Sequence, residues 1–277
     1  MRNTLAVVVV VILAIVAGYF ILREIVPSSG SDSDLDKVNG TVVISFTDQT
    51  AEMKNVTEVA MEVRNVSLYS ESRGWVEVGN KDIEYKLLEL KEKGESQLYV
   101  KAEITADTYT RAKIVLNKVS VETKNAGKKT ATMPRRNIEF AEKVVVREKE
   151  TASVHFDVLA DQSLHTTSKG EFIFTPVIKA ESRSNASVTV SSDDRVAING
   201  GNIEDTATLG MDIDGSMKAG FKIEASAKLE ISGDTILFPG RKDGAATTST
   251  IIKDILDTPA DVNLENKTEE TVNGVIK

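Results

Sequence analysis

The sequence predicts an all-β protein that carries an apolar segment at its N-terminus. Val, Ile, Thr and Ser are abundant, whereas the 277 residues include only one Trp, five Tyr and eight Phe, a composition typical of strands. From Thr41 onwards apolar and polar residues alternate in short runs, which is the period of half-buried strands. The run Leu5–Leu22 is apolar or small throughout and has the length that a membrane-spanning helix needs.

Residues 1–26 are predicted to be a retained transmembrane anchor. The apolar run exceeds the roughly 7 to 15 residues of a cleavable signal peptide, although "VAG" at Val16–Gly18 resembles a cleavage site and keeps the signal sequence as the alternative. Arg2 before the run favours an N-terminus inside the cell, and Arg23 after it partly offsets that bias. Residues 27–37 begin "PSSGSDSDLD", the composition of a flexible linker.

We therefore expect a membrane-anchored body on the extracytoplasmic side, at the cell surface. Asn-x-Ser/Thr sequons fit an exported chain that could be glycosylated. The candidate glycosylation sites are Asn39, Asn55, Asn65, Asn185 and Asn266.

Residues 38–190 are predicted to form a β-sandwich domain of the immunoglobulin-like or transthyretin-like kind. Val42, Ile44 and Phe46 share one face of a strand, and "YKLLEL" (85–90) fits either a helical turn or a strand. Short strands separated by turn signals are typical of a sandwich or barrel. The further expected strands span residues 59–63, 98–104, 112–116, 119–122, 143–147, 153–159, 171–179 and 187–191.

Residues 191–240 are predicted to form either a smaller β module or an extension of the sandwich. Phe221–Ile231 alternates over its whole length and predicts one long strand. Residues 241–277 should hold a short helix, because "STIIKDILD" places its Ile and Leu residues on one helical stripe, followed by a polar tail.

The order of several segments resembles the family called domain of unknown function 4382, found in exported bacterial and archaeal proteins that are often lipoproteins. The segments are "GTVVISFTD", "VTEVAMEVRNVSLY" before "GWVEV", "YKLLEL", "TYTRAKIVL", and "HFDVLADQSL" before "GEFIFTPVIKA", covering about residues 40–180. The resemblance implies an extracytoplasmic β-sandwich and no known chemistry. This chain departs from the family in having no lipid-bearing Cys, in Asp107 where Gly is usual, and in "MPRRN", which lacks Ser-Gly after the Pro.

Composition excludes several classes of function. The net charge is −8, and residues 191–277 hold 9 basic against 16 acidic residues, which argues against a nucleic-acid binder. The absence of Cys removes disulfides, thiolate metal sites and a nucleophilic thiol. The sequence also has no glycine-rich phosphate loop and no βαβ rhythm, so nucleotide-binding folds are disfavoured and no cofactor is expected.

The best candidate for a catalytic or metal site is "SVHFDVLADQSLH". His155 and Asp157 lie two residues apart on an expected strand, opposite Val154 and Phe156, and His165 follows. These side chains could bind a metal, or Ser163 and His165 could act as nucleophile and base. The simpler interpretation, which we favour, is a solvated outer strand face followed by a capped turn.

Three other segments are weaker candidates for binding. "MDIDGS" resembles half of a calcium loop, but Asp214-Gly215 is better explained as a hairpin turn. Trp75 could stack on a sugar, although a lone Trp in a β domain is more often a packing residue. The basic segment Lys124–Arg136 could contact an acidic polymer or lipid headgroups, or be an ordinary exposed loop. Its candidate binding residues are Lys128, Lys129, Arg135 and Arg136.

The function predicted from these features is a non-catalytic binding or structural module of the cell surface. Its expected partners are the membrane, through the N-terminal helix, and a cell-envelope polymer or another surface protein. One alternative is an envelope hydrolase or metal-dependent enzyme that uses His155, Asp157 and His165. The other is a surface subunit that assembles into filaments through its N-terminal helix.

Overall fold

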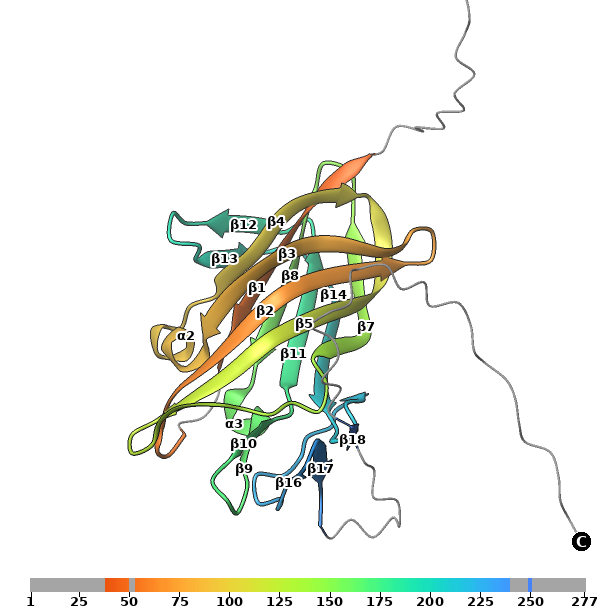
Figure 1. The fold of residues 1–277 in the computed structure, drawn as a ribbon. Helices are drawn as coiled ribbons and strands as arrows, with labels where there is room; N and C mark the ends of the chain where they lie inside the picture. The colour runs from red at the N-terminus through yellow and green to blue at the C-terminus, as the bar shows by residue number, and fades with distance from the viewer. Residues whose placement is uncertain (1–37, 50–52, 240–248, 251–277) are drawn as a thin grey trace, which may run out of the picture. The chain divides into compact units, whose positions relative to one another are not determined.

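A computed structural model describes residues 38–49, 53–239 and 249–250 (Figure 1). The chain divides into two compact units, Met1–Lys37 and Val38–Lys277, and every described residue belongs to the second. The apolar run Leu5–Leu22 and the helix expected near residue 252 lie outside the described residues. Within the described ranges, no helix has the length and apolar character needed to cross a membrane.

The prediction of an all-β protein is confirmed, because strands dominate the described chain. The larger sheet has six strands, and all its pairings are antiparallel except the parallel pairing of β1 with β8. In spatial order these strands are β15 (Met217–Ala219), β14 (Asn202–Met211), β11 (Val177–Ser184), β8 (Thr151–Val158), β1 (Asn39–Thr47) and β4 (Gln97–Thr105).

The second sheet has five strands and is antiparallel throughout. Its long strand β5 pairs with β2 on one side and with both β6 and β7 on the other. Residues 112–116 and 119–122, expected as two strands, are parts of β5. The strands are β3 (Gly74–Lys86), β2 (Val56–Ser70), β5 (Asp107–Thr123), β6 (Gly127–Thr130) and β7 (Asn137–Val146).

The remaining elements are short. Helix α2 (Leu87–Lys93) settles the ambiguity of "YKLLEL": Leu87 and Leu90 are buried on one side, and Gly94 ends the helix in a left-handed conformation at φ 60°. The others are α3 (Ala160–Ser163), β9 (Leu164–Thr166), β10 (Phe172–Phe174), β12 (Ser187–Val190), β13 (Val196–Asn199), β16 (Glu230–Ser232), β17 (Thr235–Leu237) and β18 (Ser249–Thr250).

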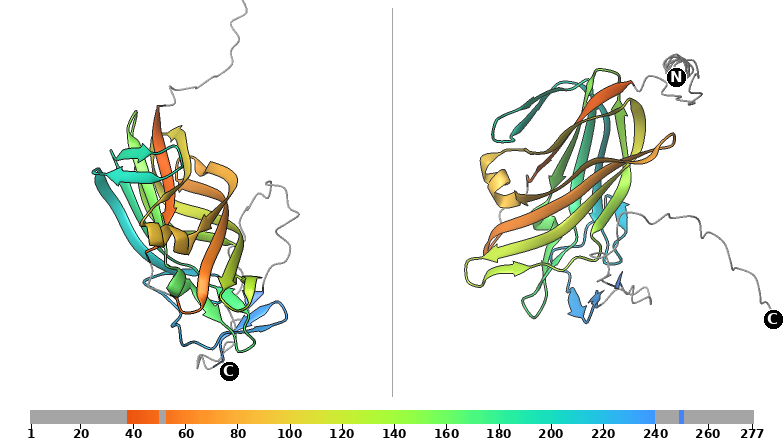
Figure 2. Two further views of the ribbon diagram at one scale, coloured as in Figure 1. Left: turned by 90° about the vertical axis from the view of Figure 1, so that its left-hand side faces the viewer. Right: turned by 45° about the horizontal axis from the view of Figure 1, so that its top comes forward.

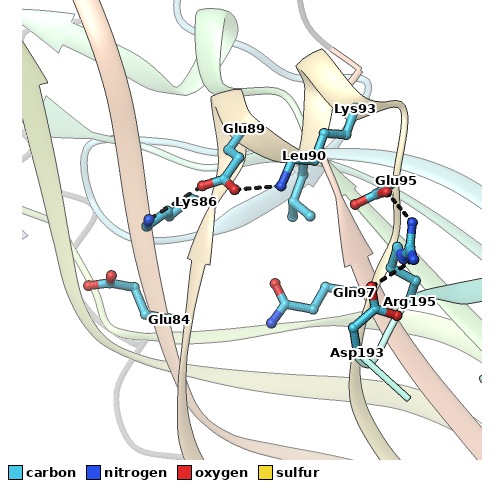
Figure 3. Close-up of a pocket in the computed structure, with 9 residues that line it drawn as sticks. All are labelled: Glu84, Lys86, Glu89, Leu90, Lys93, Glu95, Gln97, Asp193 and Arg195. Atoms are coloured by element: carbon cyan, nitrogen blue, oxygen red, sulfur yellow. Dashed lines mark hydrogen bonds and ion pairs between the residues drawn. The ribbon is translucent and has the colours of Figure 1, made fainter. Parts of the chain in front are cut away.

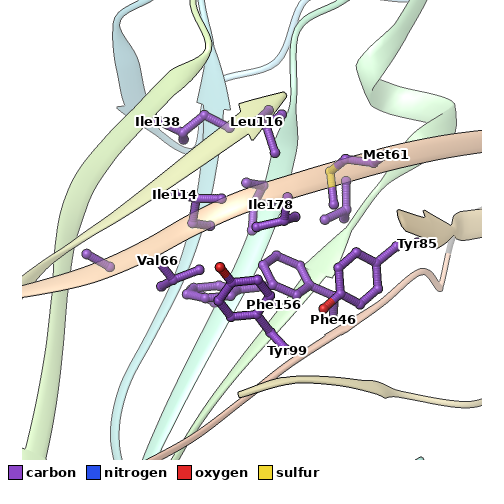
Figure 4. Packing of buried hydrophobic residues seen from close by; sticks show 14 of the residues in the cluster. Phe46, Met61, Val66, Tyr85, Tyr99, Ile114, Leu116, Ile138, Phe156 and Ile178 are labelled. Carbon is purple, nitrogen blue, oxygen red and sulfur yellow. The ribbon is translucent and has the colours of Figure 1, made fainter. Parts of the chain in front are cut away.

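The two large sheets face each other across one apolar core (Figures 2 and 4). The rings of Phe46 on β1 and Tyr85 on β3 have centroids 4.8 Å apart, and those of Phe140 on β7 and Phe156 on β8 are 5.9 Å apart. Each pair joins one sheet to the other. The alternation of apolar residues therefore lines the inner faces of both sheets, as the sequence predicted for Val42, Ile44 and Phe46.

Polar contacts close the two open sides between the sheets. On one side Tyr99 of β4 bonds to the backbone of β2 and β3 through its hydroxyl. On the other side β14 contacts β7: the Lys143 amide donates to Asp205 Oδ2 at 3.0 Å, and Glu204 pairs with Lys143 and Arg147. We call the contact between these four residues the β7–β14 seam.

The hairpin of β12 and β13 crosses the outer face of the six-stranded sheet. At its base the Ala186 amide donates to the Thr151 carbonyl on β8. Near its tip the Leu98 amide of β4 donates to the Asp194 carbonyl, and the Val196 amide donates to the Ser96 carbonyl. Because β1 lies between β8 and β4, the hairpin passes over β1.

Beyond residue 191 the structure differs from the sequence prediction in one respect. The expected long strand Phe221–Ile231 is wrong, because residues 221–229 form no strand and only β16 overlaps its end. The apolar residues of this segment instead fold around a small second cluster. Its buried members are Ile173, Ile213, Ile223, Leu229 and Ile236.

Two further features of the C-terminal part are settled by strand pairing. Strands β14 and β15 belong to the six-stranded sheet, whereas β16 pairs with β17 outside it. The hairpin turn expected at Asp214-Gly215 is confirmed, because Met211 pairs with Met217 and the Gly215 amide donates to the Asp212 carbonyl.

Candidate functional site

A charged pocket lies beside helix α2, between β3, the start of β4 and the turn that precedes β13 (Figure 3). Its volume is about 360 Å³. We call it the α2 pocket. It is lined by Glu84, Lys86, Glu89, Leu90, Lys93, Glu95, Gln97, Asp193 and Arg195.

Ion pairs hold the side chains of the α2 pocket in place. Arg195 lies 2.7 Å from Asp193 and 2.9 Å from Glu95, and these two carboxylates raise the pKa of the guanidinium. Glu89 pairs with Lys93 at 2.6 Å and Lys86 at 3.3 Å, and hydrogen bonds from these ammonium groups lower the pKa of its carboxyl. The pocket thus offers charged groups of both signs beside the apolar Leu90, an arrangement suited to a small polar or zwitterionic ligand.

Trp75 lies on the outer face of the five-stranded sheet. Its ring packs against Tyr69 with centroids 5.4 Å apart, Lys113 Nζ lies 4.5 Å from the Trp75 centroid, and Arg111 approaches both rings. We call these four residues the aromatic face. Trp75 is therefore a strand-edge packing residue whose rim is partly exposed, and Arg111 in turn pairs with Glu139.

His155 and Asp157, the first candidates for a catalytic or metal site, share one face of β8, as predicted. That face is opposite the core. His155 Nδ1 lies 3.0 Å from Ser45 Oγ, and Asp157 accepts from the Gln49 amide at 2.9 Å. Their expected solvation is wrong: Asp157 is 5% exposed, and burial lowers the pKa of His155 and raises that of Asp157. The reason is that groups from distant segments pack on this face, among them Ser45 of β1 and Lys179 of β11, which the sequence pattern cannot reveal.

His165 lies on β9, away from the partners of His155. Its Nε2 is 2.9 Å from Thr175 Oγ1, and its Nδ1 has no hydrogen-bond partner among the described residues. Burial lowers the pKa of His165 to about 4. The Ser163 hydroxyl is bonded to other groups and not to His165: it donates to the Leu159 carbonyl and accepts from the Val177 amide. The structure thus does not bring His165 together with Ser163.

The described part of the chain contains no cluster of three or more His, Asp or Glu side chains that could hold a metal ion.

The basic segment Lys124–Arg136 is partly a strand, because Lys128 and Lys129 lie on β6. Both are exposed, and each has a partner: Lys128 lies 3.9 Å from Glu84, and Lys129 donates to the Gly170 carbonyl. Arg135 is exposed and packs near Gly215, and Arg136 is half-buried.

The sequons differ in their accessibility. Asn39, Asn55 and Asn185 are exposed, and the last two lie in positive-φ positions at 65° and 49°. Asn65 is half-buried on β2, where its Nδ2 donates to Glu77. Asn266 lies outside the described residues.

Glu142 is the residue that the sequence analysis missed. It lies on β7 with 0% of its surface exposed, and burial raises its pKa to about 7. A signal was present: Ile138, Phe140, Val144 and Val146 alternate on the core face, and Glu142 occupies the same register. The α2 pocket had no such signal, because Asp193 and Arg195 reach it only through the β12–β13 turn.

Comparison with known families finds a match that begins at the first residue of β1. Residues 39–176 match the family model described as Domain of unknown function (DUF4382). The chain belongs to the DUF4382 family. No curated protein and no solved structure matches it.

The DUF4382 region ends just before β11, so three of the six strands of the larger sheet, β11, β14 and β15, follow the matched residues. Within the α2 pocket, Asp193 and Arg195 also lie beyond the DUF4382 match, whereas its other lining residues lie within it.

Proposed function

We propose that this protein is a membrane-tethered, extracytoplasmic β-sandwich protein that acts as a non-catalytic binding or structural module of the cell surface. The apolar run Leu5–Leu22 and the linker after it support the tether. Two sheets that share one core support a sandwich of the immunoglobulin-like or transthyretin-like kind. Glycosylation at the exposed Asn39, Asn55 and Asn185 is part of the same proposal.

The observation that carries the proposal is that the side chains best suited to acid–base or nucleophilic catalysis are bonded within the fold. His155, Ser163 and His165 are each held by hydrogen bonds within the fold, to Ser45, Leu159 and Thr175. Charged and aromatic side chains lie instead at the surface, in the α2 pocket and on the aromatic face. This distribution suits recognition better than acid–base catalysis.

We infer that the partner is a cell-envelope polymer or another surface protein, and not a nucleic acid. An extended polymer needs a broad contact, and the five-stranded sheet provides one that runs from the aromatic face at one end of β5 to β6 at its other end. No feature of the described residues favours the alternative of an envelope hydrolase or metal enzyme. The alternative of a filament subunit depends on residues 1–37, which the structure does not describe.

Localisation is tested by adding protease to intact cells that express the full chain. We expect the body to be removed and a small membrane-bound stub to remain. Protection of the body would contradict the outward orientation, and a mature N-terminus near Gly18 would contradict a retained anchor.

Binding is tested with purified neutral glycans and anionic envelope polymers, at low and high salt. Trp75→Ala should weaken binding at both salt concentrations if the aromatic face makes the contact, and Lys128→Gln with Lys129→Gln should weaken it only at low salt, because exposed charges are screened. Lys101→Ala, an exposed lysine on β4 in the other sheet, is the matched control. Failure of every probe to bind the wild-type chain would contradict a polymer partner.

A further inference from the structure

Glu142 is a carboxyl group buried in the core without a partner. Both of its oxygens are inaccessible to solvent and lack a hydrogen-bond partner in the described structure. The hydroxyl of Ser182 lies near, but it donates its proton to the Lys143 carbonyl at 2.5 Å and so cannot also donate to an ionised carboxylate. An ionised carboxylate in such a place is strongly disfavoured, because nothing replaces the water it has lost.

The neighbourhood of Glu142 adds to this cost. The two effects that raise its pKa to about 7 are burial, the larger, and repulsion from Asp205 on β14. Several charged groups on β7 and on the elements that contact it are paired with one another. These pairs are Glu204 with Lys143 and Arg147 between β14 and β7, Arg111 of β5 with Glu139 of β7, Asp157 of β8 with Lys179 of β11, Arg183 with Glu181 on β11, and Lys218 of β15 with Asp212. His155 on β8 is bonded to Ser45, and Tyr109 on β5 to the Thr105 carbonyl.

Glu142 sits directly behind the β7–β14 seam. Its neighbour Lys143 provides both the backbone amide that bonds Asp205 and the ammonium group that bonds Glu204 at 3.1 Å. Moving Glu142 toward water therefore requires β7 to shift where it meets β14. Proton binding at Glu142 and closure of this side of the two-sheet body are thereby coupled.

We propose that Glu142 is a proton-operated latch: in its neutral form it allows β7 to close against β11 and β14, and its ionisation opens the β7–β14 seam. The group is charged most readily when the seam is open and solvated. Closure is therefore a function of pH.

The direction and the pH window follow from linkage. The carboxyl has its ordinary pKa of 4.5 in the open form and about 7 in the closed form. The stabilisation of the closed form is complete below pH 4.5 and is lost as the pH rises to 7, with no further change above that. These values imply that the open fraction rises on the order of 50-fold between pH 5 and pH 8.

The test is hydrogen exchange of the full-length chain between pH 5 and pH 8, corrected for the intrinsic rate of amide exchange. We expect the backbone amides of residues 202–208 and 140–146 to lose protection by some tens of fold as the pH rises. Glu142→Gln, which cannot ionise, should keep the protection constant. Glu139→Gln, an exposed residue on the same strand, should behave as the wild type.

A second variant keeps the proposal testable if Glu142→Gln fails to fold. Asp205→Asn removes the repelling charge while its amide oxygen can still accept from Lys143, so the loss of protection should end at a lower pH than in the wild type. Direct titration by carbon NMR of the Glu142 carboxyl should give an apparent pKa well above that of exposed glutamates. An ordinary value near 4.5, or equal pH dependence in wild type and Glu142→Gln, would overturn the latch.

Discussion

The phenolic oxygen of Tyr99, on β4, lies 2.9 Å from the carbonyl oxygen of Arg64, on β2, and 3.0 Å from that of Gly79, on β3. A side chain of the six-stranded sheet thus satisfies backbone groups of the five-stranded sheet where the pairing of β2 with β3 is irregular. Gly79 makes room for this contact, since a Cβ there would lie 2.7 Å from the Tyr99 ring.

Removing this hydroxyl should weaken the fold without changing it. Tyr99→Phe leaves two partly buried carbonyl groups short of a donor, and we expect the free energy of unfolding to fall by about 1–2 kcal/mol. Chemical denaturation is the measurement. Tyr69→Phe, on the partly exposed aromatic face, is the matched control and should change stability by less than about 0.5 kcal/mol. Equal effects of the two substitutions would show that Tyr99 does not join the sheets.

Gly40 should tolerate no side chain. A Cβ at this position would lie 2.2 Å from the Arg147 carbonyl oxygen and 2.7 Å from Val146 Cγ1, so β1 would have to move away from the end of β7. We expect Gly40→Ala to lower the free energy of unfolding by about 2 kcal/mol or more. Thr41→Ala, at the next position, should cost clearly less in the same denaturation experiment. Wild-type stability in Gly40→Ala would mean that the two strands separate easily.

The sequence predicted a domain of residues 38–190, and the strand order shows which fragments would test that boundary. A fragment ending at residue 190 lacks β14, which pairs with β11 and supplies Leu209 and Met211 to the main core. We expect this fragment to be at least about 3 kcal/mol less stable than residues 38–239 and prone to aggregate along the exposed edge of β11.

A fragment of residues 38–219, which keeps β14 and β15 and omits β16 and β17, is the control and should retain most of the stability. Thermal melting of all three fragments, monitored by circular dichroism, gives the relative stabilities that this prediction compares. Equal stability of the 38–190 and 38–239 fragments would show that the domain boundary lies at residue 190.

His165 should make the protein sensitive to acid. Burial lowers its pKa from 6.5 to about 4, so the neutral imidazole is favoured by folding. Its contribution to stability is present above pH 6.5 and is lost as the pH falls through 4, by at most about 3 kcal/mol. His165→Gln, which does not titrate, should remove this part of the acid sensitivity. NMR titration of the imidazole is the direct measurement, and a midpoint near 6.5 would contradict its burial.

The effects of His165 and Glu142 oppose each other between pH 4.5 and 6.5. The pH dependence of global stability alone therefore cannot reveal the latch. Comparing each wild-type curve with that of its own non-titrating variant separates the two groups.

The local alternation of apolar and polar residues was sufficient to predict which face of a strand packs against the core. The alternation of Val154, Phe156 and Val158 correctly placed His155 and Asp157 on the opposite face of β8. It could not show that this face is covered, because coverage depends on β1 and β11, which lie far away in the sequence. The alternation of Phe221–Ile231 failed for a related reason: apolar residues two apart can also line a compact cluster when no strand is available to pair with them.

The sequence by itself determined the all-β class, the DUF4382 resemblance, the inner faces of the main strands and the turn at Asp214-Gly215. These features depend on the side-chain period and on local backbone preference, which a short segment carries within itself. Only the tertiary structure decided which strands are neighbours and that Tyr99 and the β7–β14 seam close the two open sides between the sheets. It also decided that Arg195 completes the α2 pocket and that the Glu142 carboxyl has no hydrogen-bond partner among the described residues. Those features arise from contacts between residues dozens of positions apart, and their energies exist only once the chain has brought the groups together and removed the water between them.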